Sequence, residues 1–311
     1  MKHMFSQLCI PTAKYKRLSP GFSDSEIYDF EFPVVVKPLD KYGSRGVLVL
    51  YSVEEIRKHF NFICATSDVK EILVEEYHDG YEFNMMSWVL DGNVHVISIA
   101  DREKTPVCTN DIPLNTRNVY PSKLIDHVYE EAKNILQKVA NYTGQTSGAL
   151  SMQFFWSPGE PISVCEVAGR FFGYEHELVE FCCGLKIENL LLDYLYDESA
   201  LRNTLMQHSP FFHRTSAVLY FHGKSGLMVD NQETAEKLSS LKDVVDSWLF
   251  YKKGERIIHH GVNPYAVRYY ISDGSRAKID CITKYIFEHI TITSPDGDEV
   301  LYQNKVPEYP R

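Results

Sequence analysis

The sequence lacks the features that mark several common protein classes. None of its apolar runs reaches the roughly 20 residues that cross a membrane, and residues 1–11 hold no apolar segment of a signal peptide. The seven cysteines are an odd number, and none of them forms a Cys-x-x-Cys pair. We therefore expect reduced thiols, a cytoplasmic location without membrane association, and no zinc site.

The common nucleotide-binding motifs are also missing. The one Gly-Lys-Ser, at residues 223–225, has Val218 where a Walker loop needs its first glycine, so we expect a hairpin turn there. No Gly-x-Gly-x-x-Gly opens a strand-helix-strand unit, which argues against a dinucleotide fold. A formal net charge of -10 argues against a nucleic-acid binder, although a local basic pocket can still hold a small anion.

What the sequence does contain is an ordinary globular composition with mixed helical and strand patterns. Its 311 residues are 44% hydrophobic and 24% charged, which is enough chain for more than one compact unit. Residues 122–141 have apolar positions on one helical face and end near Gly144. Asp91-Gly92 predicts a hairpin between strands at residues 82–90 and 93–100. These patterns indicate an α+β fold.

Two segments lack a clear periodic pattern. Residues 105–121 contain prolines and asparagines, so we expect a long ordered loop, a type of segment that is often functional. Residues 206–216 carry Pro210 and two histidines, and are the best candidate for a domain boundary. Beyond them the pattern predicts several strands and a helix at about residues 276–288.

The rest of the chain is organised around residues 32–47. An apolar β-branched run ends at Lys37, Pro38 follows, and a loop with two glycines leads into a second strand. Glycine allows backbone N–H groups to close on anionic oxygens, and Lys37, Lys41 and Arg45 add positive charge in the same place. The segment thus indicates a phosphate site, although a polar hairpin loop would give the same local pattern.

The order of signals over about residues 1–196 resembles the ATP-grasp superfamily, which includes carbamoyl-phosphate synthase large subunits and L-amino-acid ligases. The resemblance rests on these pieces: Val34-Val35-Val36-Lys37-Pro38, Gly43-Ser44-Arg45-Gly46-Val47, Ile72-Leu73-Val74-Glu75-Glu76-Tyr77, Gly80-Tyr81-Glu82-Phe83, Gln153 and Glu166-Val167-Ala168-Gly169-Arg170. It implies an α+β fold in which two subdomains clasp ATP. It also implies that a domain which relatives carry before these motifs is missing here.

For the phosphates, the resemblance implies that Lys37 contacts the α- and β-phosphates as a point charge. It further implies that the loop of Gly43, Ser44, Arg45 and Gly46 folds over them through backbone N–H groups. Glycine and basic residues are the types that such a loop needs.

For the nucleoside, the resemblance places Glu75 at the adenine amino group and the backbone of Glu76, Tyr77 and His78 along the ring edge. An adenine edge offers one donor beside one acceptor, so a carboxylate next to backbone groups suits it. Glu82 would accept hydrogen bonds from the ribose hydroxyls.

For metal ions, the resemblance implies magnesium or manganese bridging the phosphates, held by Glu166 and Gln153. An amide oxygen is a weaker ligand than the carboxylate common at that position. Ala168 stands where an asparagine is common and cannot coordinate a metal. Additional ligands could come from residues 175–177, although acidic residues also simply favour a helix N-terminus.

Two cations would act on the transferred group. Lys104, at the end of the second hairpin strand, lies where relatives place a basic residue on the γ-phosphate, and a solvated strand end is the alternative. Arg170 would face the phosphoryl group and the acyl intermediate, where a planar bidentate cation stabilises growing charge.

Taken together, the resemblance predicts an ATP-grasp domain at residues 1–205, with a small lid subdomain at about 25–90, and an additional α+β unit at 206–311. The implied activity is ATP-dependent ligation of a carboxylate to an amine through an acyl phosphate, with release of ADP and phosphate. Two alternatives stay open: carboxyphosphate and carbamate chemistry, suggested by Gln153, and an ATP-binding module that has lost turnover, suggested by Ala168. The expected partners are small molecules and no nucleic acid, and both a monomer and a homodimer stay open.

Overall fold

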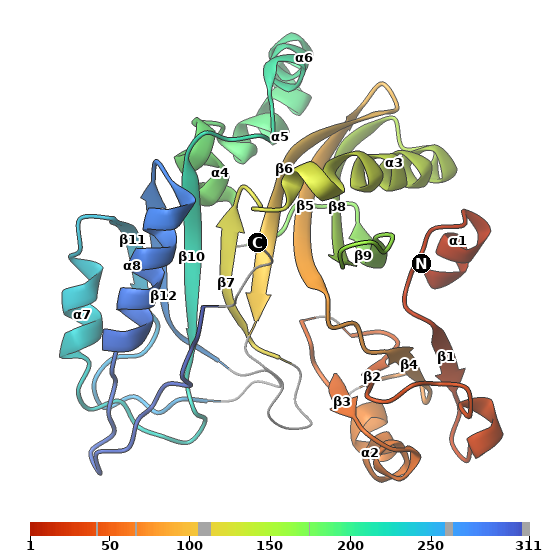
Figure 1. Ribbon diagram of the computed structural model, residues 1–311, viewed down its shortest axis with the longest axis horizontal. Coiled ribbons are helices and arrows are strands. Elements are labelled where there is room, and N and C mark those ends of the chain that lie inside the picture. Colours follow the sequence, from red (N-terminus) through yellow and green to blue (C-terminus); the bar gives the residue numbers. More distant parts are fainter. Residues whose placement is uncertain (42, 66, 105–112, 174, 259–263, 307–311) are drawn as a thin grey trace.

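The computed structural model describes residues 1–311 apart from 42, 66, 105–112, 174, 259–263 and 307–311. After helix α1 (Lys2–Gln7), the N-terminal part forms a four-stranded sheet in the order β1-β4-β2-β3. Its strands are β1 (Tyr15–Leu18), β2 (Val34–Pro38), β3 (Leu48–Leu50) and β4 (Ile72–Glu76), and helix α2 (Val53–Ala65) packs on it. Figure 1 shows this small sheet and α2 as a lobe at the lower right.

The small lobe follows directly from the sequence pattern. Along β2, Val34 and Val36 are buried, and they pack against the apolar face of α2. The helix begins after Ser52, whose hydroxyl accepts a hydrogen bond from the Glu55 N–H at 3.2 Å and so caps the helix N-terminus. This lobe therefore holds Lys37 at the end of a firmly packed strand.

The rest of the chain forms one eight-stranded sheet in the order β11-β12-β10-β7-β6-β5-β8-β9, with antiparallel neighbours. Its strands are β5 (Tyr81–Leu90), β6 (Asn93–Lys104), β7 (Asn115–Tyr120), β8 (Ser147–Trp156), β9 (Ser163–Ala168), β10 (Thr215–His222), β11 (Val244–Leu249) and β12 (Tyr265–Asp273). The predicted hairpin of β5 and β6 around Asp91-Gly92 is present, and its turn residues have positive φ.

Helices cover both faces of the large sheet (Figure 1). One face packs against α3 (Ile125–Thr143), α7 (Glu233–Ser239) and α8 (Arg276–His289). The opposite face packs against α4 (His176–Cys183), α5 (Ile187–Tyr196) and α6 (Glu198–Gln207). The helix expected at residues 122–141 is α3, and it ends at Gly144 in the left-handed conformation.

The expectation of a long loop at residues 105–121 is wrong for its last part. Residues 105–112 lie outside the described residues, but Asn115–Tyr120 form β7, a central strand with every residue buried. The error has a physical reason: Arg117 and Asn118 are polar and nevertheless face the interior, where the side chains of Glu103 and Glu175 bind them. A buried polar strand carries no apolar period to detect.

The strand pairing does not show the additional C-terminal unit as a sheet of its own. Strand β10 pairs with β7 in register from Ser216↔Tyr120 to Leu219↔Arg117, and β12 and β11 extend the same sheet. Helices α6 and α7 were not anticipated at all. No helix in the described part of the chain is long and apolar enough to span a membrane.

Candidate active site

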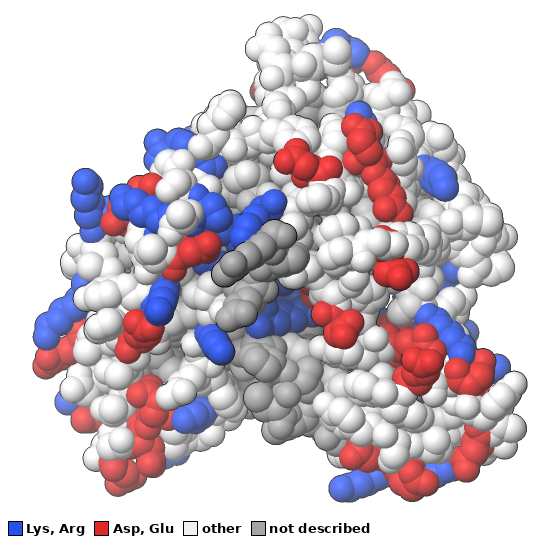
Figure 2. Space-filling view, viewed as in Figure 1, with Lys and Arg blue, Asp and Glu red and all other residues white. Residues whose placement is uncertain are grey.

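The two sheets approach each other at strand β9. A β-bulge places Cys165 as the extra residue between the pairs Gln153↔Glu166 and Phe154↔Val164. Charges from both sheets act on its thiol: Lys37 and Glu75 from the small sheet, and Glu166 beside it. Burial raises the pKa of Cys165, so the thiol stays protonated at neutral pH. Figure 2 shows Lys and Arg side chains in the hollow at the middle of the face that it draws, with Asp and Glu side chains beside them.

Lys37 lies at the end of β2 in an ion pair with Glu75 of β4. The other carboxylate oxygen of Glu75 pairs with Lys2 of α1, so one buried carboxylate lies between two lysines. Burial alone would lower the pKa of Lys37, but Glu75, with Glu166 in support, raises it above its ordinary value. Lys37 is thus a cation that faces β9 and is charged at neutral pH.

Glu82 of β5 is the centre of a second charged cluster. It pairs with Arg102 at 2.6 Å and with Lys104, both from β6, and it accepts a hydrogen bond from the side-chain amide of Gln153 on β8. The Glu82 carboxylate is 3% exposed. Gln153 donates this hydrogen bond through its Nε2, so its Oε1 is left to accept a hydrogen bond or to bind a cation.

Lys104 and His78 lie against one aromatic ring. The Lys104 ammonium is 5.3 Å from the ring centroid of Phe155, and the His78 imidazole stacks on the same ring at 5.0 Å. Burial lowers the pKa of Lys104 to about 8, although Lys104 also forms an ion pair with Glu82. Burial likewise lowers the pKa of His78, which favours the neutral ring.

The glycine loop after β2 forms a turn on the surface. Gly43, Ser44 and Gly46 have φ angles of 67°, 60° and 71°, and the Val47 N–H donates to the Ser44 carbonyl at 3.3 Å. In a turn of this kind, successive backbone N–H groups can form a concave site that suits an anion. Arg45 is exposed in the same turn.

The expected adenine strand uses part of its backbone in the small sheet. The Glu76 N–H donates to the Lys14 carbonyl at 3.0 Å, and the Tyr77 N–H donates to the Pro33 carbonyl at 3.3 Å. A base that lies along this strand would therefore meet its carbonyl groups and the backbone at His78 rather than those two donors.

The two expected metal ligands face each other across β8 and β9. Gln153 and Glu166 are direct partners in the ladder, and Glu166 is exposed on the side of the sheet that faces Lys37. A carboxylate and an amide oxygen are hard donors of the kind that magnesium prefers, so these residues fit a metal held jointly with phosphate oxygens. Among the described residues, no three of His, Cys, Asp and Glu gather into a metal site.

The alternative ligands at residues 175–177 are largely used elsewhere. His176 contacts Glu188 at 2.8 Å and the Phe172 carbonyl at 2.6 Å, which uses both ring nitrogens. Glu175 is buried and hydrogen-bonded to β5 and β7. Neither residue is directed to Gln153 and Glu166.

Arg170 follows β9 in the loop that leads to α4. Its side chain is exposed, and it donates to the neighbouring Phe171 carbonyl at 2.9 Å. The exposed guanidinium can reach an anion above the end of β9 without first breaking an ion pair in the described structure.

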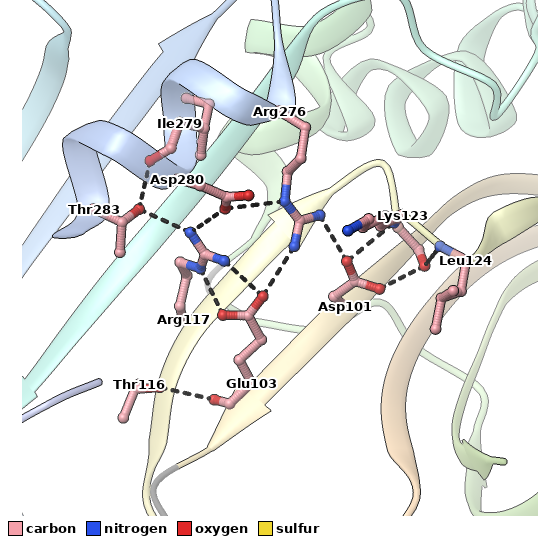
Figure 3. Close-up of polar contacts among 11 residues, drawn as sticks. Asp101, Glu103, Thr116, Arg117, Lys123, Leu124, Arg276, Ile279, Asp280 and Thr283 are labelled. Atoms are coloured by element: carbon pink, nitrogen blue, oxygen red, sulfur yellow. Dashed lines mark hydrogen bonds and ion pairs between the residues drawn. The ribbon is translucent and has the colours of Figure 1, made fainter. Parts of the chain in front are cut away.

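A separate ionic network stiffens the opposite face of the sheet (Figure 3). Arg117 of β7 is fully buried and binds Glu103 of β6 through two hydrogen bonds of 2.6 and 2.7 Å. Arg276 of α8 joins Glu103 to Asp101, and Asp280 contacts both arginines. The network fixes β6 through Asp101 and Glu103, while the alternate residues Arg102 and Lys104 lie on the other face of the sheet.

Three site residues escaped the sequence analysis: Lys2, Arg102 and Cys165. Arg102 stands two residues before Lys104, and strand alternation places both on the sheet face of Glu82. Arg102 was therefore predictable from the sequence. Lys2 and Cys165 belong to the site through contacts between segments that are far apart in the sequence. No local sequence pattern predicts such contacts.

Comparison with known proteins agrees with this geometry. Residues 30–176 match the ATP-grasp domain family. Dapdiamide A synthase of Enterobacter agglomerans is 23% identical over 235 residues, covering 72% of this chain and 53% of that protein. The chain spans about half the length of this relative and of an uncharacterised Sinorhizobium fredii protein, y4rH.

Solved structures share the fold. An L-amino acid ligase from Bacillus licheniformis superposes with a TM-score of 0.75 at 17% identity, over 94% of this chain and 70% of that one. The biotin carboxylase domain of Hydrogenobacter thermophilus 2-oxoglutarate carboxylase, in complex with MgADP, gives 0.65 at 14% identity, over 94% and 65%. Residues 30–176 therefore belong to the ATP-grasp domain family, and the chain shares the fold of these ATP-dependent enzymes.

Proposed function

We propose that this protein is an ATP-dependent carboxylate–amine ligase that forms an acyl phosphate and releases ADP and phosphate. The observation that carries the proposal is the convergence at β9: Lys37 from the small sheet faces Glu166, while Lys104 and Gln153 meet at Glu82 beside it. Cations and hard oxygen donors from two sheets would then act together on the phosphates of ATP. The names of the similar ligases support the same reaction class.

The chain's own residues would act by positioning and by electrostatics. Lys37 and the turn at residues 43–46 hold the phosphates, and Glu82 orients the ribose. Lys104 and Arg170 stabilise the charge that grows as the γ-phosphoryl group moves to the substrate carboxylate. The neutral amine then attacks the acyl carbon, the carbon–oxygen bond to phosphate breaks, and the nitrogen loses a proton as phosphate leaves.

Magnesium or manganese bound at Glu166 and Gln153 would neutralise phosphate charge during transfer. The Glu166 carboxylate is exposed, and Gln153 binds Glu82 through its Nε2, so the Glu166 carboxylate and the Gln153 Oε1 are the oxygens that would take this role.

Two other functions can be distinguished from the ligase by the substrates that they require. Carboxyphosphate chemistry, suggested by Gln153 and by similarity to a carbamoyl phosphate synthase section of Aquifex aeolicus, would require bicarbonate as the acid. A binding module without turnover, suggested by Ala168, would bind ATP with no substrate dependence. A homodimer is a further proposal, since a dimer is named for one structural relative.

The test is ADP release from magnesium and ATP, measured with pools of amino acids, small carboxylates, and bicarbonate with ammonia. We expect one carboxylate pool to stimulate release, and Arg170→Ala and Glu166→Gln each to lower the stimulated rate by about 100-fold or more. Arg202→Ala is the matched control, because Arg202 pairs with Asp91 on the surface.

Each outcome separates the candidates. Stimulation only by bicarbonate would replace the ligase proposal with carboxyphosphate chemistry. Stabilisation of the fold by ATP, with no stimulation by any pool, would favour the binding module.

A further inference from the structure

Glu175 is a buried carboxyl group that the proposed reaction does not yet use. Its Oε1 accepts hydrogen bonds from the amide of Asn84 on β5 at 2.9 Å and from the amide of Asn118 on β7 at 2.6 Å. Its Oε2 accepts from the Tyr120 hydroxyl. The Glu175 residue is 6% exposed, and burial raises its pKa.

The two asparagines leave acceptors without donors. Asn84 is 3% exposed and Asn118 is 0% exposed, and the Oδ1 of each has no hydrogen-bond partner among the described residues. Both amides must turn their NH₂ groups to the carboxylate, because only these can donate. Since the oxygen and nitrogen of an amide share one carbon, both oxygens lie close to Glu175. Buried acceptors of this kind are expected to have a partner.

This acceptor cluster adjoins the proposed reaction centre. Asn84 is the direct ladder partner of Gln153, which is in turn the partner of Glu166. The positive charge of Arg102 acts on Glu175, but the Arg102 guanidinium is paired with Glu82 at 2.6 Å. The cluster therefore offers oxygen acceptors and negative charge next to the site where an acyl phosphate would form.

We propose that Glu175, Asn84 and Asn118 form a subsite for the ammonium group of the amine substrate. An alkylammonium has three donors and no acceptor, which matches one carboxylate and two amide oxygens. An alcohol has one donor, and an anion would meet only acceptors. The inference rests on the proposed ligase function and specifies its amine as a primary amine that binds as the ammonium ion and loses one proton to water before its nitrogen attacks the acyl carbon.

The test uses L-amino acids as probes, each paired with the 2-hydroxy acid that has a hydroxyl in place of the ammonium. Binding to the full chain is measured by calorimetry in the presence of magnesium and ADP. We expect the hydroxy acid to bind at least about tenfold more weakly than its amino acid. We also expect Asn84→Leu and Asn118→Leu to weaken amino-acid binding by about tenfold or more. Asn203→Leu, at an exposed position on α6, is the control.

Glu175→Gln is the second variant, in case the leucine variants do not fold, and it removes the negative charge at almost constant volume. Equal affinity for amino and hydroxy acids, unchanged amino-acid binding in these variants, or no amino-acid binding by the wild type would overturn the subsite. The cluster would then hold a buried water only. Failure of the ligase proposal is seen separately, as ADP release that no carboxylate stimulates.

Discussion

At the scale of single residues, Lys104 gives the proposed reaction a pH dependence. The pKa of Lys104 is lowered by burial to about 8, so the ammonium is charged below that pH and becomes neutral above it. A cation on the γ-phosphate is needed in its charged form, and we therefore expect kcat/KM for ATP to fall as pH rises through about 8. Lys104→Arg should move this loss to higher pH, because arginine stays protonated.

The pH–rate profile of both proteins checks this prediction. A wild-type rate that stays constant well above pH 8, or an arginine variant that loses activity at the same pH as the wild type, would exclude Lys104 from the reaction.

Gly80 shows how one small residue shapes the site. A Cβ at this position would lie 2.6 Å from the Ser157 hydroxyl and 2.7 Å from the backbone carbonyl of Trp156 and the His78 ring. We expect Gly80→Ala to displace the His78 segment and to weaken ADP binding by about tenfold or more, because a small displacement of binding groups lowers affinity strongly. Gly274→Ala is the control, since its Cβ would meet nothing within 4 Å. Equal ADP affinity in both variants, measured by calorimetry, would contradict this.

At the scale of elements, the junction of β6, β7 and α8 depends on a buried carboxylate. Glu103 is 3% exposed and is shared by Arg117 and Arg276, whereas Asp280 of the same network is 37% exposed. We expect Glu103→Gln to lower the free energy of unfolding by about 3–5 kcal/mol, because two arginines lose their buried partner. Asp280→Asn should cost no more than about 1 kcal/mol.

Urea unfolding of the two variants measures the difference. If Glu103→Gln is no less stable than Asp280→Asn, the network does not hold β6 in place. The orientation of Lys104 would then need another cause.

The same elements explain what the sequence could predict. Strands with apolar alternation, such as β2, and helices with one apolar face, such as α3, were predictable from local pattern. Strand β7 was not, because its buried Arg117 and Asn118 donate hydrogen bonds to side chains from β6 and from the start of α4. Such pairing between distant segments leaves no local hydrophobic periodicity in the sequence.

At the scale of the whole molecule, the site lies where two sheets with separate cores meet. Motifs located the residues at each strand end, such as Lys37 and Glu166, but their approach depends on the bulge at Cys165. The pairing of β10 with β7 likewise joins segments far apart in sequence, so the change of pattern after residue 206 looked like a new unit. The domain limits at 205 and 206 remain a prediction.

The central claim is that the substrate carboxylate itself accepts the γ-phosphoryl group. The most direct test supplies the stimulating acid with ¹⁸O in its carboxylate and measures the released phosphate by mass spectrometry. We predict one ¹⁸O atom per phosphate in the presence of the amine, because the carbon–oxygen bond of the acyl phosphate breaks when the amine attacks. Phosphate without label, formed at the same rate as ADP, would contradict the account and indicate hydrolysis of ATP by water.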